Sequence, residues 1–131
     1  MGKVKSLLVV PALLVMNISL MAQSNGWNVP PAFKSMKNPV TQNEAGVKSG
    51  QAVFTRNCLA CHGKTGQGNG VKAASLRNFP GDFSRPEFQN LTDGEILYRV
   101  KTGKGEMPKF EAKLTDEEIW NVIIYLRTFK K

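Results

Sequence analysis

The sequence is poor in residues that bind metals or exchange protons near neutral pH. Its 131 residues include only two cysteines and one histidine. A structural zinc site takes about four cysteine or histidine ligands, so three such residues are too few to build one. Strand patterns are also missing, which excludes the β-α-β setting in which a thioredoxin-like C-x-x-C pair works. The chain is therefore predicted to be all-α.

Long runs of one charge are absent as well. The 18 basic and 10 acidic residues are interleaved along the chain, with no basic stripe and no aromatic platform on which bases could stack. We therefore expect no nucleic-acid partner. Excess positive charge speeds and orients encounters with negatively charged surfaces, so an acidic protein partner or an anionic membrane face is expected instead.

The N-terminal segment is typical of a secretory signal. Two lysines precede an apolar stretch over residues 7–16, and small residues suited to cleavage follow. A proline and an asparagine keep the stretch short of the eighteen or more apolar residues of a membrane span. We predict a signal peptide over residues 1–22, cleaved after Ala22 or Ser24, and hence a periplasmic or otherwise extracytoplasmic protein. A retained membrane anchor is the alternative.

Residues 23–43 are predicted to form an extended arm. Three prolines lie between Trp27 and Val40, which excludes a regular helix over that segment and a place inside a sheet. The aromatic residues of the arm and Met36 could pack it onto the domain or a partner, or the arm could be a flexible leader. The domain proper is expected over residues 44–131.

Three helices are expected in this domain. Apolar and small residues at spacings of three and four predict a helix over residues 44–57, in which Gly50 indicates the close approach of another backbone. Capping boxes that begin at Thr92 and Thr115 predict two more helices, the last reaching about residue 128.

Both cysteines and the histidine fall within five consecutive positions, Cys58-Leu59-Ala60-Cys61-His62. Two thiols at this spacing can each add across a vinyl group of haem, and the adjacent imidazole is then placed to ligate the iron. This is the C-x-x-C-H pattern of c-type haem attachment. One covalent haem would also supply the core that so small a domain lacks. The glycine-rich segment 63–86 is predicted to be one long loop, and such loops usually wrap something functional.

The second axial ligand of this haem would have to be a methionine. No second histidine or third cysteine exists, and Met36 and Met107 are the methionines beyond the signal. Met107 is favoured because Pro108 stiffens its loop, and a thioether is an established partner of haem iron. With His62 and Met107 on both axial positions, no coordination position stays open for a substrate. We therefore predict one-electron transfer, no enzymatic activity and no small-molecule substrate.

The chain resembles the class I monohaem cytochromes c of bacteria over about residues 45–129. The matching residues are Cys58 to Gly63, Gly50 and Phe54, the Gly66-x-Gly68-x-Gly70 loop, Met107-Pro108, and Trp120 to Arg127 with Tyr125. The resemblance implies a cytochrome c-like fold with three to four helices wrapped around one covalently bound haem. It also implies that the helix with Gly50 crosses the last helix near Tyr125, and that a carbonyl of a proline-containing loop, for which Pro80 is one candidate, accepts the proton of His62.

The predicted function is that of a periplasmic one-electron carrier between respiratory redox proteins. Lysines that flank the proposed ligands would dock acidic patches of a reductase, an oxidase or a respiratory complex. The protein would associate with a membrane only through such partners or through a retained signal. These lysines are Lys64, Lys72, Lys101, Lys104, Lys109 and Lys113. Two alternatives stay open: a haem c subunit of a larger respiratory complex, contacting it through the arm, and a haem sensor or peroxidase-like protein with a labile sixth ligand.

Overall fold

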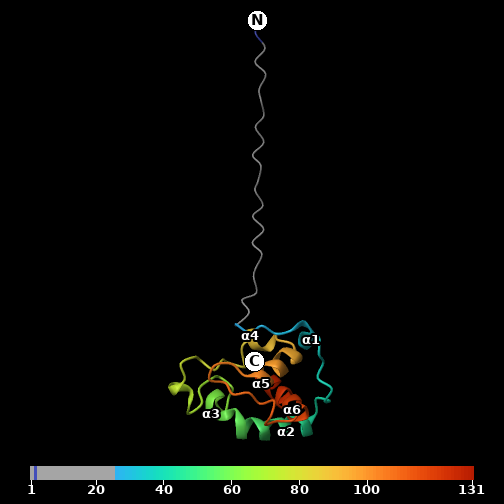
Figure 1. Cartoon of the computed structure of the whole chain (residues 1–131), viewed down its shortest axis with the longest axis vertical. Helices are drawn as coiled ribbons and strands as arrows, with labels where there is room; N and C mark the ends of the chain where they lie inside the picture. The colour runs from blue at the N-terminus through green and yellow to red at the C-terminus, as the bar shows by residue number, and fades with distance from the viewer. Residues whose placement is uncertain (1, 3–25) are drawn as a thin grey trace.

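The computed structural model describes residue 2 and residues 26–131, and it shows a helical domain preceded by an arm (Figure 1). The longer helices are α2 (Glu44–Asn57), α5 (Asp93–Thr102) and α6 (Asp116–Arg127). Between them lie the short elements α1 (Pro31–Lys34), α3 (Leu59–His62), η1 (Ala73–Ser75) and α4 (Pro86–Gln89). The described residues contain no strand, only an isolated bridge between Lys104 and Met107. The all-α prediction is confirmed.

The proposed signal peptide, residues 1–22, lies outside the described residues. Across the part of the chain that is described, none of the helices is both long and apolar enough to traverse a bilayer.

Helices α5 and α6 begin at the two predicted capping boxes. The Thr92 hydroxyl accepts a hydrogen bond from the Glu95 amide at 3.1 Å, and the Glu95 carboxylate accepts one from the Thr92 amide at 2.8 Å. Thr115 and Glu118 repeat this exchange at 3.2 and 2.9 Å. Each box satisfies two amides that a helix N-terminus leaves without partners, so the sequence fixes where these helices start.

The core forms where α2 crosses α6. A Cβ atom added to Gly50 would overlap the backbone carbonyl of Asn121 and lie 2.9 Å from Cβ of Tyr125, so only glycine allows the two backbones to come this close. One turn later on α2, the Phe54 and Tyr125 rings lie 5.3 Å apart. The crossing near Tyr125 is thus confirmed. The most deeply buried side chains around it are Phe54, Ile96, Leu97, Ile119, Val122 and Ile123.

The N-terminal arm packs along α5 and α6, which favours the packed alternative over a flexible leader (Figure 1). Val29 is buried, and the Phe33 ring meets Tyr98 of α5 edge-on with centroids 5.0 Å apart. The Asn38 amide donates a hydrogen bond to the Trp120 carbonyl at 3.0 Å. Helix α1 was not expected in this proline-rich stretch. Pro31 occupies its first turn, where a missing amide hydrogen costs nothing.

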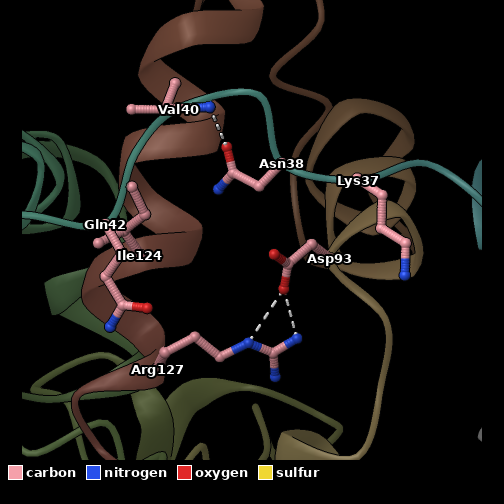
Figure 2. A pocket seen from close by; sticks show the side chains of 7 residues that line it. All are labelled: Lys37, Asn38, Val40, Gln42, Asp93, Ile124 and Arg127. Atoms are coloured by element: carbon pink, nitrogen blue, oxygen red, sulfur yellow. Dashed lines mark hydrogen bonds and ion pairs between the residues drawn. The ribbon is translucent and has the colours of Figure 1, made fainter.

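Arg127 ties the end of α6 to the start of α5. Its guanidinium donates to the Asp93 carboxylate at 2.6 Å, and to the carbonyls of Gln89 and Leu91 at 3.0 and 2.7 Å. Figure 2 shows the Arg127 and Asp93 side chains pointing toward one another beneath the arm, where a cavity of about 280 Å³ lies. The cavity is part of the seam between arm and helices.

Candidate functional site

The C-x-x-C-H segment continues directly from α2. The Cys58 amide donates to the Phe54 carbonyl at 2.8 Å, and the Cys58 carbonyl accepts from the amides of Cys61 and His62 at 3.2 and 3.0 Å. These bonds make α3 a single hydrogen-bonded turn on the end of α2, a helix with one buried face. Both cysteines are half-buried free thiols.

The long glycine-rich loop folds back over this turn. The amides of Gly68, Gly70 and Lys72 donate to the carbonyls of His62, Cys61 and Ala60 at 2.8, 3.1 and 2.8 Å. These are carbonyls that the end of a helix leaves without partners. A Cβ on Gly70 would overlap the Ala60 carbonyl, so the glycine permits the close approach. The predicted loop is thus an ordered cap on α3, interrupted by the short turn η1.

His62 sits in an apolar setting. Its ring stacks on Phe83 with centroids 4.5 Å apart and 23° between the planes. Burial lowers the pKa of His62 to about 4, so the imidazole is neutral at pH 7 and keeps a lone pair for a metal. Its Nδ1 atom is buried without a hydrogen-bond partner among the described residues, so no bond to Pro80 is seen. A buried imidazole with an unpaired nitrogen is costly unless something else binds the ring.

Met107 stands in a tight turn at the end of α5. Gly103 ends the helix with φ of 58°. Two backbone hydrogen bonds of 3.0 Å then join Lys104 and Met107 across the turn. Met107 is half-buried and packs against the core. The other candidate, Met36, is 39% exposed and follows α1 in the arm.

A groove of about 760 Å³ runs between these two parts of the chain, with Cys61 on one side and Pro108 on the other. The volume lies within the range of cofactor sites. Free thiols beside a neutral buried imidazole are the donor set that a c-type haem needs, so these residues fit the group. Before attachment the Cys58 thiol would be protonated at pH 7, because burial and then the charge of Cys61 raise its pKa to about 12.

Sequence reasoning missed two residues that support the site. Phe83 lies in the long loop, outside any helix, and only the fold brings its buried ring onto His62. The Glu106 carboxylate accepts hydrogen bonds from the amides of Arg77 and Asn78 at 2.7 and 3.3 Å, which ties the long loop to the Met107 turn. Neither contact has a local signal, because the partners are far apart in sequence.

The six lysines proposed for docking fall into different environments. Lys101 forms an ion pair with Asp116 at 2.7 Å, and the Lys104 ammonium reaches the Gly26 carbonyl and the face of Trp27. Lys64, Lys72 and Lys113 line the groove with exposed side chains, and so does Arg56 of α2. Lys109 is exposed but is not part of the groove lining.

The family described as cytochrome C oxidase, cbb3-type, subunit III matches residues 45–126. Cytochrome c6 of Diacronema lutheri is 40% identical over 86 residues, which cover 61% of this chain and 92% of the relative. Cytochrome c6 of Synechococcus elongatus is 37% identical over 82 residues, which cover 63% of this chain and 88% of the relative.

Solved structures agree in fold. The KustC0563 c-type cytochrome has a TM-score of 0.55 and 30% identity, over 63% of this chain and 98% of that one. A chain of the Kuenenia stuttgartiensis reducing HAO-like protein complex Kustc0457/Kustc0458 has a TM-score of 0.64 and 25% identity over 71% of this chain, which spans 47% of that longer chain. The chain belongs to the class I monohaem c-type cytochromes, electron carriers that bind one covalent haem c.

Proposed function

We propose that the chain is an extracytoplasmic one-electron carrier whose haem is attached through Cys58 and Cys61 and ligated by His62 and Met107. The observation that carries this proposal is the groove itself, because Cys61 and the Pro108 that follows Met107 face it from opposite parts of the chain. Residues 1–22 would act as a signal peptide, removed after Ala22 or Ser24.

Bound haem supplies a one-electron ferric–ferrous couple. A Met107 sulfur on the iron would favour the ferrous form, and so would the low polarity around His62 and Phe83, which disfavours the extra positive charge of the ferric form. Two residues held by short backbone turns also leave little to rearrange between the two oxidation states. Since both axial positions would be filled, the carrier would bind no substrate and catalyse no reaction.

The ligand assignment is tested by optical spectra of the holoprotein and two variants. A weak far-red band of the ferric form reports methionine sulfur on the iron. We expect Met107→Ala to lose this band and to let carbon monoxide bind the ferrous form. The matched control is Met36→Ala, which removes the other candidate and should keep the band. A band retained in Met107→Ala would move the ligand elsewhere, and one lost in Met36→Ala would assign Met36.

The exposed side chains of Arg56, Lys64, Lys72 and Lys113, here called the basic rim, would dock acidic patches of redox partners. Glu106 is the only acidic residue among those lining the groove, and its carboxylate is turned onto the long loop. Lys101 and Lys104 leave the docking set proposed from sequence, because Asp116 and the arm already bind them. Positive charges around the opening of the groove attract and orient partners whose surfaces are negative.

The rim is tested with two small redox reagents of opposite charge, ferricyanide and tris(phenanthroline)cobalt(III). The rate constant with ferricyanide should fall as ionic strength rises, and Lys72→Glu should lower it at low salt while raising the rate with the cobalt complex. The control Lys48→Glu makes the same charge change eight residues before Arg56 on α2, about 12 Å away. Equal effects of the two variants would refute a local rim.

One observation favours a second candidate, a subunit of a larger complex: the similar fold in a chain of the HAO-like protein complex. The arm is poorly suited to be the contact with such a complex, because Val29 and Phe33 already pack it onto α5 within this chain. Gel filtration of a cell extract cleared of membranes distinguishes the two candidates. The free carrier should elute as a monomer, and the subunit with its larger complex.

A further inference from the structure

The start of the described chain reaches the turn that holds Met107. Two cationic side chains lie over the Trp27 ring: the Arg99 guanidinium is 5.5 Å and the Lys104 ammonium 5.7 Å from its centroid. The Lys104 ammonium also donates to the Gly26 carbonyl. These contacts join Gly26 and Trp27 of the arm to Arg99 in the last turn of α5 and to Lys104, two residues after the helix ends.

Lys104 is also bonded directly to Met107 through its backbone. The amide and carbonyl of Lys104 both bond to Met107, at 3.0 Å each, across a turn of two residues. The arm thus touches the side chain of the residue whose backbone fixes the proposed ligand. Arg99 extends the support by one helical turn, since its carbonyl accepts from the Gly103 amide at 3.0 Å where α5 ends.

We propose that Trp27 is a positioning residue for Met107: through Lys104 and Arg99, the arm braces the ligand turn and lowers the rate at which the thioether leaves the iron and the fraction of time it is away. This inference rests on the proposed ligation by Met107. Trp27 lies before the residues matched by the family, 45–126, whereas Arg99 and Lys104 lie within them, so the arm's side of the brace is an addition to the domain. Both proposed cleavage positions keep Trp27 in the mature chain.

Other parts of the arm serve as an internal control. Phe33 packs on Tyr98 toward the middle of α5, and a Cβ on Gly94 would overlap the Phe33 carbonyl. This anchor belongs to the same arm and the same helix, but it has no contact with Lys104 in the structure. Loss of Phe33 should loosen the arm without loosening the turn.

The binding of added imidazole to ferric protein measures the fraction of molecules in which Met107 has left the iron. An added ligand binds only the fraction of ferric protein in which the thioether is away, so its apparent association constant is proportional to that fraction. Two cation–π contacts of about 0.5–1 kcal/mol each correspond to roughly a tenfold change when both are lost. We expect Trp27→Ala to raise the association constant at least threefold, with the far-red band weakened, and Phe33→Ala to raise it less than threefold.

The test uses full-length ferric holoprotein, and denaturant midpoints are recorded for each variant. A merely structural role for Trp27 would lower the midpoint in both arm variants and change the imidazole constant equally. If Trp27→Ala does not accumulate, Lys104→Gln, at an exposed side chain, removes the ammonium that contacts Trp27 and Gly26 while leaving the Arg99 contact, and it must still give a threefold rise. A rise in the imidazole association constant below threefold, or an equal rise in Phe33→Ala, would overturn the brace and leave the ligation by Met107 standing. Wild-type protein without the far-red band would overturn the Met107 ligation and the brace together.

Discussion

Replacement of Gly50 by alanine tests the crossing of α2 and α6 on which the domain is built. The added Cβ would overlap the Asn121 backbone carbonyl and come within 2.9 Å of Tyr125 Cβ. A helix backbone cannot swing aside as a side-chain end can, so α2 and α6 must separate. Overpacking costs about 1–3 kcal/mol, and this geometry calls for the upper end of that range.

The higher helix propensity of alanine returns part of this cost, about 1 kcal/mol. We therefore expect Gly50→Ala to lower the free energy of unfolding by about 2 kcal/mol, which corresponds to roughly 10 °C in Tm for a domain of this size. Guanidinium unfolding of the ferric holoprotein, followed by helical circular dichroism, gives the value if the slope m is unchanged.

Gly46→Ala is the matched control, one turn earlier on the same face of α2. Its added Cβ would lie 3.3 Å from Asn121 Oδ1 and from Ile124 Cδ1, the ends of side chains that can shift. Stability should change by less than about 1 kcal/mol in either direction. If Gly50→Ala is as stable as Gly46→Ala, the reasoning about backbone contact at the crossing is refuted.

Three further substitutions test other contacts. Arg127→Lys keeps the charge but loses the fork that grips Asp93 and two carbonyls, and should lower the unfolding free energy by about 1–2 kcal/mol in denaturant titration. Glu106→Ala removes the acceptor for the Arg77 amide, and trypsin should then cut after Arg77 severalfold faster. Thr115→Ala breaks the capping box of α6 and should cost about 1 kcal/mol of stability by the same titration.

Each of these has a control in the same chain. Arg85→Lys changes an arginine that is 66% exposed and lies 3.8 Å from the Asp82 carboxylate, and it should leave stability unchanged. Glu111→Ala changes an exposed glutamate and should leave the cleavage rate unchanged. Thr55→Ala removes an exposed hydroxyl inside α2, where alanine is the better helix former. A control that matched its test variant would contradict the corresponding contact.

The local parts of the fold could be predicted because their causes lie within a few residues. The capping boxes at Thr92 and Thr115 set the starts of two helices, and the glycines of the loop after His62 predicted its irregular path. Gly50 predicted a close approach, since a glycine in the middle of a helix is unfavourable unless another backbone needs the space.

The remaining parts depend on contacts between residues far apart in sequence. Nothing near Phe83 predicts that its ring lies on His62, and nothing near Trp27 predicts that it meets Arg99 and Lys104. The sequence around Lys104 likewise does not predict that its ammonium reaches the Gly26 carbonyl.

The most direct test of the whole account is the intact mass and solvent behaviour of the exported protein. The account predicts a red protein that keeps its colour in acidic acetone, with the mass of the chain cleaved after Ala22 or Ser24 plus one haem. Replacement of both Cys58 and Cys61 by alanine should abolish that added mass. Colour that passes into the acetone, or a mass equal to the polypeptide alone, would contradict the account.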